Sequence, residues 1–339
     1  MKSIITTTFA AVVVCFAIQT ARAADEVSFG PQDPGFTYEN PQEVFTDQQA
    51  TEFAYHTDCG SGCNSCCEPW YAAFRSDHEF DTFMEPVTNP VFFEDPRSKT
   101  RLRVFFLNQQ IPEGSALGGG DYQGYHAQVT VALSERWTFL ANKDGYLTVQ
   151  SDALPNTEGW ANLGTGFKYV FVRDPCNQFL FSGGFLYEWS QGSSEVFQGN
   201  GDGIWNFFLT TGKGWDRSHF IGTVGWHLPE DGGQHTESMF YSLHLDYMLN
   251  DDLYVLWELN GIHYIDAGRR TPASFDLEGG DLINLGTIGV SGNSMVTTAF
   301  GFNWKANCAL SLAVAYEFPL TDREDLMDNR TTVSARFEY

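Results

Sequence analysis

From Thr100 onward, the sequence consists of segments of about ten to fourteen residues in which polar and apolar side chains alternate. Neighbouring side chains of a β-strand point to opposite faces, so each segment predicts a strand with one apolar and one polar face. Segments of this length can cross a membrane as tilted strands. We expect strands near residues 100–110, 122–133, 136–149, 159–172, 177–189, 203–212, 217–227, 236–248, 252–264, 294–304, 308–318 and 329–339.

The connections between these segments alternate in length. Tight turns are expected at 134–136, 173–177, 213–216, 249–252 and 305–307, and the other connections are longer. Outer-membrane barrels have short periplasmic turns and long external loops. Counting the strand-like run at 280–290 as a wall strand would put long connections at both ends. We therefore place it in an external loop that folds inward or forms a small hairpin. The predicted fold class is all-β, an antiparallel transmembrane β-barrel of about 12 strands preceded by an irregular N-terminal segment.

Aromatic residues distinguish this barrel from a soluble β-sandwich, whose strands alternate in the same way. The chain contains 29 Phe, 14 Tyr and 9 Trp but only 18% charged residues. The buried face of a sandwich usually holds Val, Ile and Leu, whereas membrane proteins place aromatic side chains at the two interfaces. Aromatic residues occur here at strand ends, at Trp137, Trp189, Trp205, Trp226, Trp304 and Tyr339.

Two further segments precede the barrel of residues 100–339. Residues 1–23 carry Lys2, an apolar run, and Ala-Arg-Ala before Ala24, which predicts a signal peptide. Residues 24–99 are acidic, irregular and rich in proline. We expect this cysteine-containing segment to lie in the periplasm or to plug the lumen. Together these features predict a bacterial outer-membrane protein surrounded by lipid, as a monomer or a trimer.

Charge limits the partners of the chain. Its 43 acidic and 19 basic residues give a net charge of −24 without a basic stripe, which argues against nucleic acid. The polar faces of the strands predict a lumen of mixed charge, which either lines a channel or pairs internally and closes it. The pore-lining candidates are Arg101, Arg103, Lys168, Glu188, His244, Asp246, Glu258, Lys305, Glu317, Arg336 and Glu338.

The chain ends on "TTVSARFEY", an alternating strand that finishes on an aromatic residue. This ending resembles the signal that outer-membrane barrels present to their assembly machinery, with Phe337 two residues before the terminal Tyr339. The barrel assembly machinery is therefore an expected partner.

Residues 100–339 resemble the porin-like transporters related to the phenol-degradation meta-pathway outer-membrane family. The resemblance lies in "ERWTFLANKDGYL", "EGWANLGTGFKYVF", "GNGDGIWNFFLTTGKG" and "LAVAYEFPLTDREDLMDNRTTVSARFEY". It implies passage of small solutes, hydrophobic ones among them, with no catalytic residues and no cofactor.

Two other functions stay open at this stage. A closed structural or adhesive surface barrel would show the same alternation of side chains. An outer-membrane hydrolase is suggested by Ser242, His244 and Asp246, which share one strand face. That face is expected to be the lumen, whereas a lipid-cleaving site opens toward lipid. We therefore do not predict an enzyme.

The cysteines predict disulfides, because exported cysteines are usually oxidised and their number after residue 23 is even. Cys176 and Cys308 fall at expected periplasmic turns, so a bridge to the N-terminal cluster would tie that cluster to the barrel rim. A zinc site is the alternative, but the cluster lacks paired Cys-x2-Cys motifs separated by a loop, and we predict no metal. The disulfide candidates are Cys59, Cys63, Cys66, Cys67, Cys176 and Cys308.

Overall fold

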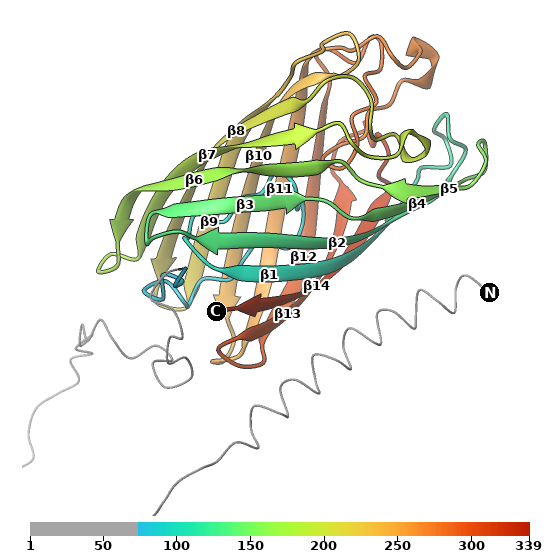
Figure 1. Ribbon diagram of the computed structural model, residues 1–339. Helices are drawn as coiled ribbons and strands as arrows, with labels where there is room; N and C mark the ends of the chain where they lie inside the picture. Colours follow the sequence, from blue (N-terminus) through green and yellow to red (C-terminus); the bar gives the residue numbers. More distant parts are fainter. Residues whose placement is uncertain (1–73) are drawn as a thin grey trace, which may run out of the picture. The chain divides into compact units, whose positions relative to one another are not determined.

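The computed structural model describes residues 74–339, which fold into a β-barrel (Figure 1). Two short 3-10 helices, η1 (Ser194–Val196) and η2 (Ala273–Phe275), lie in loops. The strand segments are β1 (Arg101–Gln110), β2 (Gly120–Ala132), β3 (Trp137–Lys143), β4 (Tyr146–Ser151), β5 (Thr157–Trp160), β6 (Leu163–Asp174), β7 (Phe179–Trp189), β8 (Ile204–Trp215), β9 (Ser218–Pro229), β10 (Glu237–Met248), β11 (Leu253–Asp266), β12 (Ser294–Lys305), β13 (Leu310–Pro319) and β14 (Asn329–Glu338).

The sheet closes on itself because β1 pairs with β2 on one side and with β14 on the other. Strands β3 and β4 both pair with β2, while β6 continues the sheet from β3 and β5 from β4. The segments β3 and β4 are therefore two parts of one wall strand, and β5 and β6 are two parts of the next. The result is a closed antiparallel barrel of 12 strands, which confirms the predicted fold class and count.

The break between β3 and β4 has a local cause at Gly145. Its φ angle of +118° is a conformation that side chains other than glycine rarely adopt. A Cβ atom at this position would also meet Nδ1 of His126 at 2.4 Å. The strand is therefore interrupted where the imidazole of His126 lies against Gly145 and contacts the carbonyl of Asp144.

The connections confirm the predicted alternation. Those at one end of the barrel contain at most four residues, at 133–136, 175–178, 216–217, 249–252 and 306–309, and those at the other end contain five or more. Residues 280–290 contain no strand, only one isolated bridge between Thr287 and Thr271. The loop 267–293 folds inward, because Leu282, Ile283 and Val290 are all buried.

The outer face of the wall is apolar. On β12, Phe300 and Phe302 are 56% and 51% exposed, while Asn303 between Phe302 and Trp304 is fully buried. Alternation of this kind places an oily surface outside and polar groups inside, as a barrel in lipid requires. No helix within residues 74–339 combines the length and the apolar character needed to span a membrane.

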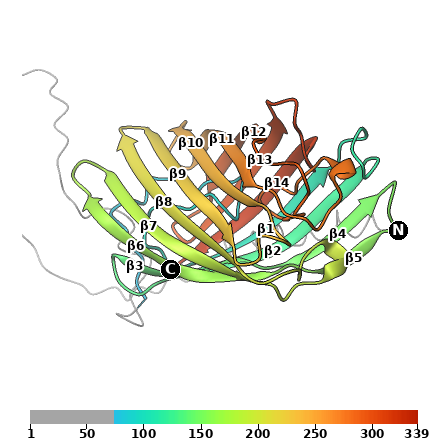
Figure 2. The ribbon, with the colours of Figure 1, turned by 90° about the horizontal axis from the view of Figure 1, so that it is seen from above.

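The interior is filled by two pieces of chain. One is residues 76–99, which we call the inner segment, and it runs inside the ring of strands (blue to cyan in Figure 2). Its Phe80, Phe83 and Phe93 pack against inward-facing wall residues such as Leu180 and Ile221. The other piece is the loop 267–293, which packs with Phe92 in the largest apolar cluster of the barrel.

Candidate functional site

The inner segment enters and leaves the lumen at a single point, which we call the neck. The backbone N–H of Asp77 donates to the carbonyl of Ser98 at 2.9 Å, and that of Thr100 donates to Oγ of Ser76 at 2.9 Å. The N–H of Tyr339 donates in turn to the carbonyl of Thr100 at 3.0 Å. The neck therefore lies where β14 meets β1, and the wall closes without help from the inner segment.

Wall side chains bind the backbone of the inner segment. An irregular, proline-rich backbone has no strand partner for its carbonyl groups, and buried carbonyls need donors. Inward-facing hydroxyl, amide and guanidinium groups supply them at 2.6 to 2.8 Å. The pairs are Ser182 with Pro96, Thr210 with Glu94, Gln128 with Pro90, Thr130 with Lys99, and Arg103 with Val87.

Glu258 of β11 binds the backbone of the inner segment at its central turn. Its carboxylate accepts the backbone N–H groups of Val87 and Thr88, both at 2.7 Å. The imidazole of His244 lies between two carboxylates, with Nδ1 at 2.7 Å from Glu258 and Nε2 at 3.1 Å from Asp246. These wall residues thus form a fixed polar receptor for the turn.

The same contacts bear on the hydrolase alternative. Ser242 accepts a hydrogen bond from the Asn89 side chain at 2.9 Å, and both ring nitrogens of His244 face carboxylates. A serine nucleophile needs a base that can take its proton. Ser242 and His244 are instead bonded to other groups, and both are fully buried inside the barrel.

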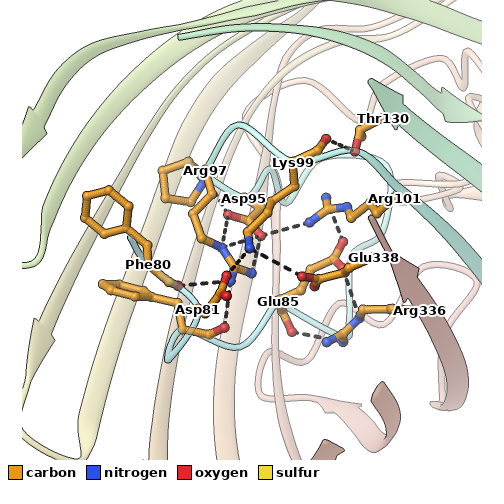
Figure 3. Close-up of polar contacts among 12 residues, drawn as sticks. Phe80, Asp81, Glu85, Asp95, Arg97, Lys99, Arg101, Thr130, Arg336 and Glu338 are labelled. Atoms are coloured by element: carbon orange, nitrogen blue, oxygen red, sulfur yellow. Dashed lines mark hydrogen bonds and ion pairs between the residues drawn. The ribbon is translucent and has the colours of Figure 1, made fainter. Parts of the chain in front are cut away.

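Charged groups cluster at the neck end of the lumen (Figure 3). Glu85 of the inner segment lies 2.9 Å from Arg101, 3.0 Å from Arg336 and 3.7 Å from Arg103. Asp95 pairs with Arg101 at 2.9 Å. Wall arginines of β1 and β14 are thus neutralised by carboxylates from the inner segment.

Two adjacent carboxyl groups of the inner segment have opposite environments. Burial acts to raise the pKa of Asp95, but the charges of Arg97 and Arg101 outweigh it and hold that pKa well below its usual range. Burial raises the pKa of Glu94, although the charge of Lys168 opposes the rise. Glu94 therefore takes up a proton far more readily than Asp95.

The remaining charged candidates are paired on the inner face. Lys99 contacts Asp81 and lies 3.4 Å from Glu338, and Lys305 donates to the carbonyl of Asp81 at 3.1 Å. The other pairs are Lys168 with the carbonyl of Asp95, Glu188 with Lys143 at 2.6 Å, and Glu317 with Arg330 at 2.7 Å.

An apolar cluster fills part of the external half of the lumen. Inward-facing Leu107, Leu140 and Phe240 pack with Leu282 and Leu285 of the loop 267–293. At the external mouth, a polar cavity of about 1080 Å³ lies between residues 110–120, 274–277 and 322–329. The barrel therefore combines a charged neck end with an external half in which this apolar cluster lies beside buried ion pairs such as Arg330 with Asp281.

The eleven charged residues singled out from the sequence all lie on the inner face, and whether they line a solute path stays a prediction. Sequence reasoning missed their partners Asp81, Glu85 and Asp95, which lie in a segment without periodicity. The one available signal was the run of acidic residues between prolines in "MEPVTNPVFFEDPRS".

The structure describes two of the six cysteines that were predicted to form disulfides, Cys176 and Cys308. Cys176 is a free, exposed thiol at the turn between β6 and β7, so the structure does not support its predicted disulfide. Cys308 lies in the turn before β13, and its pairing stays a prediction.

Within residues 74–339, no three His, Cys, Asp or Glu side chains are grouped so as to hold a metal ion. Residues 1–73 lie outside the described residues, and with them the predicted signal peptide and Cys59, Cys63, Cys66 and Cys67.

Comparison with solved structures finds similar barrels. An outer-membrane channel from Pseudomonas putida F1 superimposes with a TM-score of 0.53 at 11% sequence identity, over 76% of this chain and 100% of the other. The NanC porin gives a TM-score of 0.44 at 9% identity, over 71% and 100% of the two chains. A KdgM porin in complex with disordered oligogalacturonate gives 0.41 at 10%, over 70% and 99%. No family model and no curated protein matches the sequence. The first likeness shows a shared barrel fold, and the resemblance to the meta-pathway family stays a prediction.

Proposed function

We propose that this protein is a bacterial outer-membrane channel for small solutes, closed by the inner segment and opened when that segment leaves the lumen. The apolar outer face suits lipid, and the barrel fold is shared with an outer-membrane channel. In this proposal residues 24–99 form a plug domain and residues 100–339 the conducting wall.

The neck is the observation that carries this proposal. Both ends of the inner segment meet at Asp77 and Ser98, while β1 pairs directly with β2 and β14. The segment is therefore a closed excursion into the lumen, and its displacement breaks no strand pairing. Inward-facing polar groups that now bind its carbonyls would then be solvated in a water-filled channel.

Passage also requires movement of the loop 267–293, whose buried apolar side chains fill part of the external half of the lumen. Solutes that take the place of Leu282 and Leu285 would contact Leu107 and Phe240 of the wall. We therefore expect small solutes with an apolar part. The barrel acts in this proposal without catalytic residues or a cofactor.

Deletion of the inner segment tests the channel. Residues 78–97 are removed and Asp77 is joined to Ser98 through two glycines, which the neck geometry allows. We expect the refolded variant to give ion-conducting steps in planar bilayers far larger than those of the wild-type barrel. The matched control carries two glycines inserted beside the exposed Gly232, where a side chain would meet no atom within 4 Å. This control should conduct as the wild type does.

A closed structural or adhesive barrel is the second candidate, and the filled lumen favours it. A deletion variant that shows a folded β-spectrum and resists heat on a gel, yet stays silent in bilayers, would refute the channel and support this alternative.

The route to the membrane completes the proposal. Residues 1–23 act as a signal peptide in a Gram-negative cell and are removed on export. The barrel assembly machinery then receives the final strand through Phe337 and Tyr339. Cys308, in the turn before β13, pairs with the N-terminal cysteine cluster and ties it to the barrel rim.

A further inference from the structure

Three arginines of the wall converge on one carboxylate of the inner segment. Arg101 and Arg103 project inward from β1, and Arg336 projects inward from β14 directly opposite Arg103 in the strand register. Their guanidinium groups lie 2.9, 3.7 and 3.0 Å from the carboxylate of Glu85. All four side chains are at least nine-tenths buried. We call the three arginines the arginine cradle.

Glu85 leaves donors around the cradle unused. Nε of Arg103 and Nδ2 of Asn303 have no hydrogen-bond partner within residues 74–339, and neither has the hydroxyl of Ser334. These side chains are 2%, 0% and 2% exposed. Asn303 is part of the same arrangement, because its Oδ1 accepts a hydrogen bond from Arg336 at 3.1 Å. Unpaired buried donors cost free energy, so the wall is better suited to a carboxylate that is free to turn toward these donors than to the tethered carboxylate of Glu85.

Guanidinium groups are matched to carboxylates in shape and charge, since a planar fork of N–H donors faces two oxygens. When the inner segment leaves, it takes the carboxylates of Glu85 and Asp95 with it, while the arginines stay on the wall. A cavity of about 20 Å³ already adjoins Glu85 and Arg336 at the neck end. The open barrel would then expose a strongly cationic site between β1 and β14.

We propose that the arginine cradle binds the carboxylate of a small organic anion in the open channel, and that Glu85 occupies this site as an internal competitor when the channel is closed. This inference rests on the proposed channel function. The ligand class follows from the present occupant, because a side-chain carboxylate already fills the site. Anions and the inner segment thus compete for the same donors.

The first test measures ion selectivity in asymmetric KCl and in potassium acetate. Glu85→Gln keeps the arginines and removes the competing charge, so it should raise the open probability severalfold and give an anion-preferring reversal potential. Adding Arg101→Gln, Arg103→Gln and Arg336→Gln to this variant should abolish the anion preference. The matched controls Glu79→Gln, exposed on the same segment, and Arg269→Gln, exposed on an external loop, should behave as the wild type does.

The second test measures acetate binding by calorimetry to the barrel that lacks residues 78–97. We expect saturable binding that weakens about tenfold or more when the three arginines are replaced, in line with the loss of buried charge pairs. If that barrel conducts but the arginine substitutions change neither selectivity nor acetate binding, the cradle is not an anion site and the channel function stands. If it binds acetate through the arginines yet never conducts, the site stands and the channel function fails.

Discussion

At the scale of single residues, the adjacent carboxyl groups of Glu94 and Asp95 differ because their neighbours differ. Asp95 lies between Arg97 and Arg101, at 2.6 and 2.9 Å, and keeps its charge. One oxygen of Glu94 accepts a hydrogen bond from Asn142, and the other has no partner within residues 74–339. Burial therefore dominates at Glu94 and raises its pKa, against the charges of Lys168 and Arg101 and together with that of Glu85.

This difference predicts that acid favours the closed channel. When the inner segment fills the lumen, which we call the seated state, the pKa of Glu94 is raised. When the segment leaves and Glu94 is in water, this pKa returns to about 4.3. Between these values the seated state binds more protons, so its stability falls as pH rises through the raised pKa and is regained as pH falls. A tenfold difference in proton affinity between the two states corresponds to about 1.4 kcal/mol. We expect the open probability in bilayers to fall as the pH is lowered through this window.

Glu94→Gln provides the control, because its amide cannot titrate and keeps nearly the same shape. The variant should lose the pH dependence in this window and stay as closed as the protonated wild type. A pH dependence that persists in Glu94→Gln would assign the effect to another group. Asp95→Asn should open the channel at every pH, because Arg97 and Arg101 lose their partner.

At the scale of elements, the loop 267–293 restricts the external half of the lumen through its apolar side chains. Ile283 is 3% exposed and packs in the main apolar cluster, whereas Ile288 on the same loop is 43% exposed. Ile283→Asn buries an amide among apolar groups at a cost of about 1–3 kcal/mol and should release the loop. We expect a higher bilayer conductance for this variant than for Ile288→Asn, the matched control. Equal conductances would mean that the loop does not narrow the path.

The final strand separates recognition by the assembly machinery from stability. Phe337 faces outward near the end of β14, beside Leu310 and Leu102, where a charge costs only about 0–1 kcal/mol. Val333 faces outward in the middle of the same strand, where a charge costs more. Phe337→Asp should therefore refold well in detergent but fail to assemble in cells.

Val333→Asp is the matched control. Compared with Phe337→Asp, it should lose more stability in detergent and less assembly in cells. Heat-modifiability on gels measures both properties. Normal insertion of Phe337→Asp in cells would contradict the proposed role of the C-terminal aromatic residues.

The wall strands were predictable from the sequence and the inner segment was not, for one physical reason. A wall strand such as β10 faces lipid with Tyr241 and Tyr247 and the interior with Ser242 and His244, so two solvents impose a two-residue period. From Phe83 to Lys99 every residue of the inner segment is buried, so no period marks its faces. The inward orientation of Arg101 and Arg336 was thus readable, but their partner Glu85 was not.

At the scale of the whole molecule, the alternation of connection lengths predicts the orientation of the barrel. Single cysteines replacing the exposed Gly232 and Asp322 lie in long connections and should react with a membrane-impermeant thiol reagent on intact cells. Cysteines replacing Asn250 and Asp216 lie in tight turns and should react only after the outer membrane is breached. Cys176 is changed to Ser in all variants, because its thiol is exposed. The opposite labelling pattern would invert the orientation.

The position of Glu85 between β1 and β14 also bears on the order in which the barrel assembles. Closing the ring brings Arg101 to Glu338, nearly the full length of the barrel sequence, and such distant pairing is slow because loop closure costs entropy. Glu85 is close in sequence to Arg101 and meets it early, so it presents a ready carboxylate to Arg336 when the last strand arrives. We expect Glu85→Gln to close the ring more slowly than Glu79→Gln during refolding into lipid vesicles, timed by the appearance of the heat-modifiable form. The residue that keeps the finished channel shut would in this way be the one that guides its last two edges together.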